Sequence, residues 1–231
     1  SYVLFLVNYA LGQGAFGYYL NRTGVSGLRA VGVTLFLIGT NFATLLVVTT
    51  VAWMFAGSNP AHAALWWTLL VGCAALLVYL IVIAIAPRFI AKIQVLAPLF
   101  DGGLRGHAIA IIGRLPHVAA LVLSFWVALR VWGIPVPLVA GLTLLPAVVI
   151  ASVLPISPAG LGTTQAALVY FFSDFAAGAT PADRHAHVLA FAVVYFVYAV
   201  VSALVIGLAC TPFAKRLGIM PENNHRLPNV P

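Results

Sequence analysis

Charged residues are scarce in this sequence, and acidic residues are the scarcest of all. Charged side chains make up 6% of the 231 residues, and only four are Asp or Glu, whereas about a quarter of the residues in a soluble globular domain are charged. This scarcity excludes a soluble fold, and the 63% of hydrophobic residues indicates an integral membrane protein. It also leaves little material for general acid–base chemistry or an acidic proton relay.

Cysteines and catalytic motifs are also few. Cys73 and Cys210 are the two cysteines, and both lie in apolar runs, which excludes a disulfide framework. No nucleophile-elbow serine, zinc-protease or phosphate-loop motif is present. Asp183, His185 and His187 form a D-x-H-x-H pattern, which we interpret as a solvated loop rather than a metal site. We therefore expect no metal and no cofactor, and we favour a non-enzymatic function over a catalytic one.

Long apolar runs dominate what is present. Seven segments lie at about 1–20, 28–56, 64–86, 107–131, 137–153, 163–178 and 188–211, and most have the length of membrane-spanning helices. The sequence predicts an all-α, polytopic integral membrane helix bundle. The fifth and sixth segments each cover about 25 Å, less than the ~30 Å hydrocarbon core. They predict a broken or re-entrant helix pair hinged at 155–162, and two tilted full spans remain the alternative.

The basic residues predict the orientation. They gather in the connections at 21–29 and 87–106 and in the tail, while the opposite connections contribute only Arg184. The positive-inside rule places the first group, with the tail, in the cytoplasm. These residues lie in connections rather than on an aromatic-rich basic surface, so we predict no nucleic-acid partner. The stretch 87–106 predicts an amphipathic helix at the cytoplasmic interface, ended by a turn at Gly102 and Gly103, with a solvated loop as the alternative.

The connection between the fifth and sixth segments reads PISPAGLGTTQ over residues 155–165. Pro155 and Pro158 remove backbone donors, and Gly160 and Gly162 permit backbone angles that other residues avoid. In hydrocarbon, such a break is tolerated only where protein or a water-filled cavity covers the freed polar groups. The next helix presents unpaired N–H groups and its positive dipole end, which favours an anion such as a lipid phosphate. That helix opens with Thr163, Thr164 and Gln165.

Polar residues inside the other segments are further candidates. In the fourth segment, His107, Arg114, His117 and Ser124 share a helical stripe about 100° wide. An arginine at membrane depth usually faces the bundle interior or a cavity, although Arg114 is also close enough to the cytoplasmic end to snorkel.

Asn41, Tyr195, Tyr198 and Asp174 are polar or acidic residues whose role in the apolar segments has two interpretations each. Asn41 in the second segment, and Tyr195 and Tyr198 in the last, either line a cavity or serve interhelical packing. Asp174 lies near the outer end of the sixth segment, where it either pairs with Arg130 or Arg184 or is solvated.

The stretch 155–162, followed by Ala166, Ala167 and Leu168, resembles the Pro-Gly hallmark of the lysylphosphatidylglycerol synthase transmembrane family, also called flippase-like. The first connection is similar to that family too, through Asn8, Gly14, Tyr19-Leu20 and Arg22-Thr23-Gly24-Val25-Ser26. The resemblance implies a polytopic fold that handles lipids. Its known relatives translocate aminoacylated phospholipids or serve as partners in lipid-linked glycan and hopanoid pathways.

This chain departs from the family pattern at charged positions. The family Arg-Glu pair falls on Thr164 and Gln165, and the Glu expected after Gly14 falls on Ala15. Charge-dependent roles are therefore not carried over, and the resemblance is that of a divergent member.

These observations predict a membrane lipid transporter or flippase-like protein that binds an anionic, phosphate-bearing lipid headgroup at the break. An intramembrane lipid-modifying enzyme and a partner subunit of a lipid or glycan pathway are the alternatives. We assign residues 1–212 to one transmembrane lipid-handling domain, which we expect to continue before Ser1, and 213–231 to a short polar cytoplasmic tail. We expect a bacterial cytoplasmic membrane, and either a homo-oligomer or a membrane-enzyme partner. The predicted substrate contacts are Pro158, Gly160, Gly162, Thr163, Thr164, Gln165, Arg114, His117, Asn41, Tyr195 and Tyr198.

Overall fold

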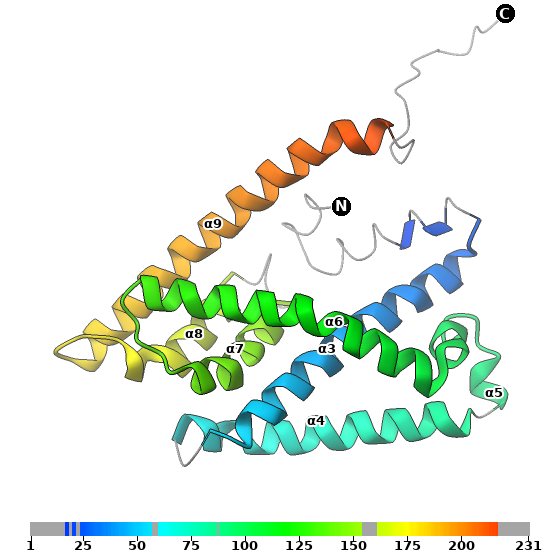
Figure 1. The fold of residues 1–231 in the computed structure, drawn as a ribbon, viewed down its shortest axis with the longest axis horizontal. Helices are drawn as coiled ribbons and strands as arrows, with labels where there is room; N and C mark the ends of the chain where they lie inside the picture. The colour runs from blue at the N-terminus through cyan, green and yellow to red at the C-terminus, as the bar shows by residue number, and fades with distance from the viewer. Residues whose placement is uncertain are drawn as a thin grey trace, which may run out of the picture.

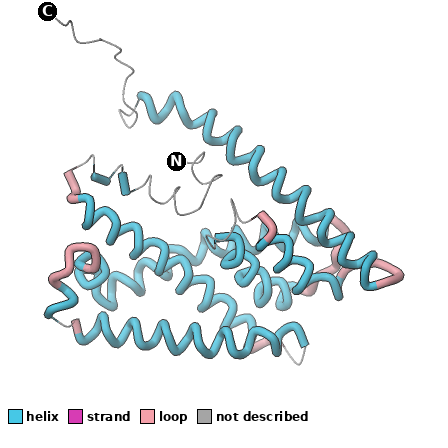
Figure 2. Tube along the Cα trace, turned by 180° about the vertical axis from the view of Figure 1, so that it is seen from behind, coloured by secondary structure: helices cyan, strands magenta, loops and turns pink. Residues whose placement is uncertain are grey.

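The computed structural model describes residues 17–18, 20–21, 24–56, 60–86, 88–153 and 161–216. These residues form helices joined by short loops, with no β-strand among them (Figure 2). The prediction of an all-α fold is confirmed. In chain order the elements are α3 (Gly27–Trp53), α4 (Pro60–Ile85), α5 (Arg88–Ala91), α6 (Ala97–Val131), α7 (Leu138–Val153), α8 (Thr163–Phe172), the short 3₁₀ helix η2 (Ser173–Phe175) and α9 (Pro181–Arg216).

Four helices are long and apolar enough to cross a membrane, within the part of the chain that the structure describes. They are Gly27–Trp53, Leu65–Ile85, Ala97–Val131 and Pro181–Cys210. They correspond to the second, third, fourth and last of the seven predicted segments. The fifth is the shorter apolar helix α7, and the sixth is divided between α8 and η2. The first predicted segment lies almost wholly outside the described residues. The structure is therefore compatible with a membrane protein.

The predicted amphipathic helix over 87–106 is wrong as a single element. Only one turn, α5, forms after Arg88, and α6 begins at Ala97. The glycine turn is correctly placed, because α6 leaves helical geometry at Gly103, with φ 52° and ψ −173°. A positive φ is accessible to glycine without the steric penalty that a Cβ brings. The break therefore separates a short first section from the long apolar section that follows it.

Helices α3, α4 and α6 run lengthwise through the molecule, whereas α9 starts near the end of α6 and slants away from them (Figure 1). Helices α3 and α6 are parallel, because Arg29 pairs with Asp101 near their starts and Asn41 bonds Arg114 further along. Helices α4 and α9 run in the opposite direction. The loop after α3 and the turns after α6 and η2 therefore lie at one end, which we call the outer end. The other, or inner, end holds α5 and the start of α3.

The core of the bundle surrounds α7. This helix packs against α3, α6 and α8, and α8 in turn packs against α9. Gly141 lets α7 lie close to α6, because a Cβ added there would lie 2.6 Å from Cδ1 of Trp126 on α6. Helices α7 and α8 therefore stand beside the outer half of α6 (Figure 1). Fully buried core side chains include Val118, Val122, Leu129, Leu144, Leu145, Val148, Leu168, Phe172 and Val188.

The two ends differ in chemistry. All five tryptophans lie toward the outer end: Trp53 ends α3, Trp66 and Trp67 belong to the first turns of α4, and Trp126 and Trp132 flank the end of α6. Trp53 and Trp66 stack with ring centroids 5.0 Å apart. Tryptophan is enriched at membrane–water interfaces. The basic residues of α5, the linker after it and the start of α6 lie at the opposite end, in agreement with the predicted charge asymmetry.

Candidate functional site at the start of α8

The first turn of α8 is built on one glycine and one glutamine. Gly162 precedes the helix with φ 93° and ψ −53°, a conformation that glycine adopts far more readily than residues with a Cβ. Its N–H donates to Oε1 of Gln165 over 2.6 Å, which is half of a capping box. The hydroxyl of Thr163 donates to the carbonyl of Ala151 over 3.0 Å and ties α8 to the last turn of α7.

Some predicted contacts cannot be placed. Pro158 and Gly160, together with Pro155, lie outside the described residues. Thr164 is half-buried in the first turn of α8. The described part of the predicted break therefore runs from Leu161 to Gln165.

Gln165 is buried, with 6% of its surface exposed, and its Nε2 has no hydrogen-bond partner among the described residues. The bond from Gly162 fixes the amide orientation, because a flipped amide would set two donors against each other. A buried amide N–H without an acceptor costs about 1–3 kcal/mol. Because no described residue supplies that acceptor, the Nε2 group is a candidate donor to a ligand or to water.

The start of α8 lies part-way along the bundle rather than at either end. Gly141 of α7 packs on Trp126 of α6, and α7 turns back along α6 from there. Ten residues further along α7 is Ala151, and ten residues back along α6 is Pro116. Because Thr163 bonds Ala151, the start of α8 lies at the level of Pro116, about 20 Å from the outer end of α6.

A second polar group lies at this same level. Arg114 donates from Nη1 to Oδ1 of Asn41 over 3.4 Å, and both side chains are half-buried. The structure thus brings together two of the predicted contacts, between α3 and α6. The Arg114–Asn41 pair joins α6 to α3, whereas the start of α8 is bonded to α7. The two polar groups therefore lie at the same distance along the bundle but between different helices.

The structure divides the predicted polar stripe of α6. His107 and Arg114 face the protein, whereas His117 and Ser124 are exposed. The buried face of α6 is centred on Val118, and His117 is one residue, or about 100°, away from it around the helix. The four residues of this stripe therefore have different environments, although they lie on one side of the helix.

Sequence analysis missed the partners of His107. Nε2 of His107 lies 2.6 Å from the Tyr79 hydroxyl, and Nδ1 lies 2.7 Å from the carbonyl oxygen of Gly103. The ring of Phe36 packs edge-on against the imidazole, with centroids 4.8 Å apart. Tyr79 is an isolated polar side chain within an apolar run, and that pattern could have marked it. These contacts join α3, α4 and α6 at the glycine break.

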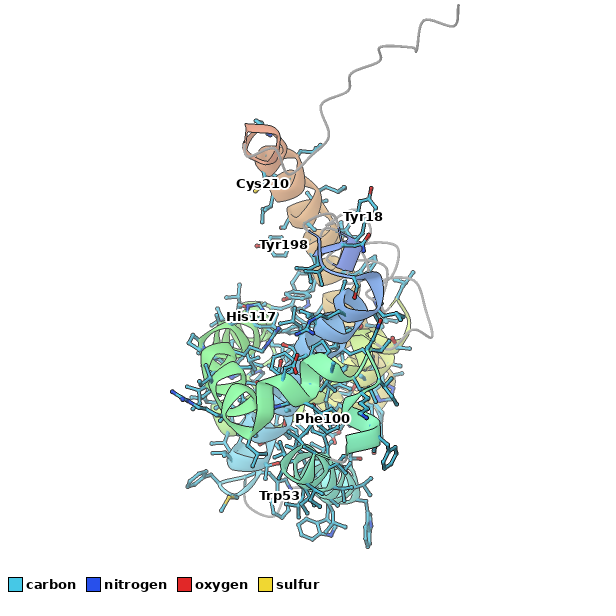
Figure 3. All side chains as sticks on the ribbon, turned by 90° about the vertical axis from the view of Figure 1, so that its right-hand side faces the viewer. Tyr18, Trp53, Phe100, His117, Tyr198 and Cys210 are labelled. Carbon is cyan, nitrogen blue, oxygen red and sulfur yellow. The ribbon has the colours of Figure 1, made fainter. Side chains whose placement is uncertain are left out.

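The two tyrosines of α9 have different surroundings. Tyr195 packs on Phe125 with ring centroids 4.1 Å apart and also contacts Phe191. This is the packing alternative stated above. Tyr198 is exposed, and in Figure 3 it lies higher in the view than His117 on α6.

The interpretation of the D-x-H-x-H pattern as a loop is wrong, because the pattern lies in the first turns of α9, where Asp183 caps the helix. The Asp183 carboxylate accepts the N–H and the hydroxyl of Thr180, and the Asp183 N–H donates back to that hydroxyl oxygen. The imidazole of His187 lies 3.3 Å from the carbonyl oxygens of Ala177 and Trp132. Among the described residues, no group of three or more His, Cys, Asp or Glu side chains could hold a metal.

The charged residues at the outer end have partners. Arg184 lies 3.5 Å from Asp174, which is one of the two pairings predicted for that carboxylate. Arg130 stacks over the ring of Trp126 at 5.2 Å, as an interfacial anchor would.

Comparisons of this chain with protein-family models, with curated proteins and with solved structures found no match.

Proposed function

We propose that this chain is a membrane lipid transporter or flippase-like protein that binds an anionic lipid headgroup at the first turn of α8. The observation that carries the proposal is the buried Nε2 of Gln165, which has no hydrogen-bond partner among the described residues and lies at a helix N-terminus part-way along the bundle. An amide donor and a helix N-terminus both favour an oxyanion. In a membrane, the most abundant oxyanion that reaches this depth from the side is a lipid phosphate.

The short helices support a site at this depth. Helix α7 has 16 residues and α8 has 10, so they extend about 24 Å and 15 Å, less than the ~30 Å hydrocarbon core. We infer that they form a re-entrant pair that enters from the outer end. Helix ends at such a depth are tolerated only beside protein or a water-filled cavity. A lipid headgroup beside the first turn of α8 would satisfy the amide of Gln165.

Orientation and location belong to the same proposal. The basic inner end faces the cytoplasm, and the tryptophan-rich outer end faces the opposite side, under the positive-inside rule. The resemblance of residues 155–168 to the flippase-like family motivates a bacterial cytoplasmic membrane as the location.

Reconstituted vesicles test the proposal with two matched glycine substitutions. Gly162→Leu and Gly133→Leu each place a side chain at a positive φ, 93° and 85°, and neither Cβ meets an atom within 4 Å. Gly133 lies in the turn at the outer end, far from the start of α8. We expect Gly162→Leu to slow the movement of a fluorescent anionic phospholipid about tenfold or more, and Gly133→Leu to leave it near the wild-type rate.

Two results would count against lipid transport. Equal rates for wild type and Gly162→Leu would separate lipid movement from the start of α8. A headgroup-modified lipid, detected by mass spectrometry of the same vesicles, would favour a lipid-modifying enzyme instead.

A further inference from the structure

Arg114 is a cation at mid-level in the bundle that no described carboxylate neutralises. It bonds Asn41, which stands near the middle of the 27-residue helix α3. A guanidinium has five N–H donors and never loses its charge in a protein, and one neutral amide oxygen at 3.4 Å satisfies at most one of these donors. Charged side chains at membrane depth are costly unless an ion, a polar group or water meets them.

The acidic residues are committed elsewhere. Asp101 pairs with Arg29 at the inner end, Asp174 pairs with Arg184 at the outer end, and Asp183 caps α9 together with Thr180. The fourth acidic residue of the chain, Glu222, lies outside the described residues. Within the described chain, the level of Arg114 therefore carries an uncompensated charge of +1.

We propose that Arg114, oriented by Asn41, binds an oxyanion with one net negative charge, either a lipid phosphodiester or a soluble phosphate. This inference rests on the proposed function for its lipid ligand and narrows the substrate class. A phosphodiester accepts two parallel N–H bonds from a guanidinium. A zwitterionic lipid brings an ammonium group as well, and no described carboxylate at this level can receive it. The site therefore selects net negative lipids over zwitterionic ones.

The approach to Arg114 is open on one side. Gly113, Pro116 and His117 are exposed on α6, so an anion can reach the guanidinium without unpacking the core face around Val118. The exposed imidazole of His117 lies close along the helix and can donate a further hydrogen bond to the same oxyanion.

Two substitutions test the site. Asn41→Asp places a carboxylate of nearly unchanged size against Arg114, so that the protein supplies its own counter-ion, while Arg114→Gln removes the charge. The matched control is Arg130→Gln, which removes a cation from the same helix at the outer end, where Arg130 stacks on Trp126. Each protein is placed in phosphatidylcholine nanodiscs that contain either phosphatidylglycerol or phosphatidylethanolamine. Nanodiscs of phosphatidylcholine alone are measured with and without inorganic phosphate. Bound lipid is counted by native mass spectrometry, and phosphate binding by a thermal shift.

We expect wild type and Arg130→Gln to retain phosphatidylglycerol over phosphatidylethanolamine. Asn41→Asp and Arg114→Gln should each bind phosphatidylglycerol roughly ten- to a hundredfold more weakly, as for the loss of a charged hydrogen-bonding partner. If instead only inorganic phosphate binds in an Arg114-dependent way, the ligand is a soluble anion. Unchanged lipid preference and unchanged phosphate binding in both variants would overturn the inference.

Gln165→Leu separates this inference from the proposed function. If lipid binding depends on Gln165 but shows no charge preference, the anion site at Arg114 is rejected and the lipid-handling proposal stands. If anion binding depends on Arg114 while lipid movement is insensitive to Gly162→Leu, the lipid-handling proposal is rejected and the anion site stands.

Discussion

Buried polar side chains in this bundle differ in how their hydrogen bonds are met. Thr34, Thr44 and Thr143 each donate to the carbonyl four residues earlier in their own helix, so they need nothing from neighbouring helices. Both ring nitrogens of His107 have hydrogen-bond partners, the hydroxyl of Tyr79 and the carbonyl oxygen of Gly103. Gln165 alone among the described side chains keeps a buried atom without a partner, and this difference is why we place the ligand there.

At the residue scale, we predict that Tyr79→Phe destabilises the protein by roughly 1–3 kcal/mol, because it leaves Nε2 of the buried His107 without its partner. Tyr170→Phe is the control, since Tyr170 is 69% exposed. Thermal unfolding in detergent should show a lower Tm for Tyr79→Phe and little change for Tyr170→Phe. Equal Tm values for the two variants would contradict a structural role for the His107 contacts.

Close helix approaches depend on glycines at specific places along an element. A Cβ on Gly32 of α3 would lie 2.1 Å from the carbonyl oxygen of Val95 and 2.9 Å from the Pro98 ring. The linker between α5 and α6 therefore sits directly on α3. Together with the pairing of Arg29 and Asp101, this contact fixes where the first section of α6 lies before it breaks at Gly103.

At the element scale, we predict that Gly32→Ala destabilises the protein by about 1–3 kcal/mol through overpacking against backbone atoms that cannot rotate away. Gly39 lies on the same helix, and a Cβ there meets nothing within 4 Å. Gly39→Ala should be neutral or stabilising by up to about 1 kcal/mol, because alanine favours helix. Unfolding curves of the two variants give the comparison, and a Gly32→Ala protein as stable as Gly39→Ala would show that the linker does not rest on α3.

The molecule as a whole combines a basic inner end, a tryptophan-rich outer end and two short helices between them. In the proposed membrane topology, the parity of the connections puts the loops around Lys92 and Ala179 on opposite sides of the membrane, whether or not α7 and α8 cross it completely. The positive-inside rule then decides which side is the cytoplasm.

At the scale of the whole molecule, we predict opposite labelling of two single cysteines. In a background with Cys73 and Cys210 replaced by alanine, Ala179→Cys should react with a membrane-impermeant maleimide in intact cells. Lys92→Cys should react only after permeabilisation, because the basic end faces the cytoplasm in the proposed orientation. Both residues are exposed in their loops. Labelling of both cysteines from outside would contradict the assigned topology.

Much of the fold follows from apolar length alone, which is why α3, α4, α6 and α9 match predicted segments. Where sequence reasoning failed, three-dimensional packing decided. The stripe from His107 to Ser124 is continuous on a helical wheel, but α3 and α4 cover only one edge of it. The stretch 87–106 looks amphipathic, yet a new helix, α6, begins next to Pro98 and is broken again at Gly103. The pairing of Arg114 with Asn41 depends on parallel α3 and α6, which no local pattern specifies. The family resemblance remains a hypothesis.

The most direct test is an experimental structure of the protein in nanodiscs containing phosphatidylglycerol. We predict headgroup density within hydrogen-bonding distance of the Gln165 amide nitrogen, at a membrane depth between the tryptophans of the outer end and the basic residues of the inner end. A first turn of α8 in bulk water at the membrane surface, or a Gln165 amide bonded to another part of the protein, would contradict a lipid headgroup site there.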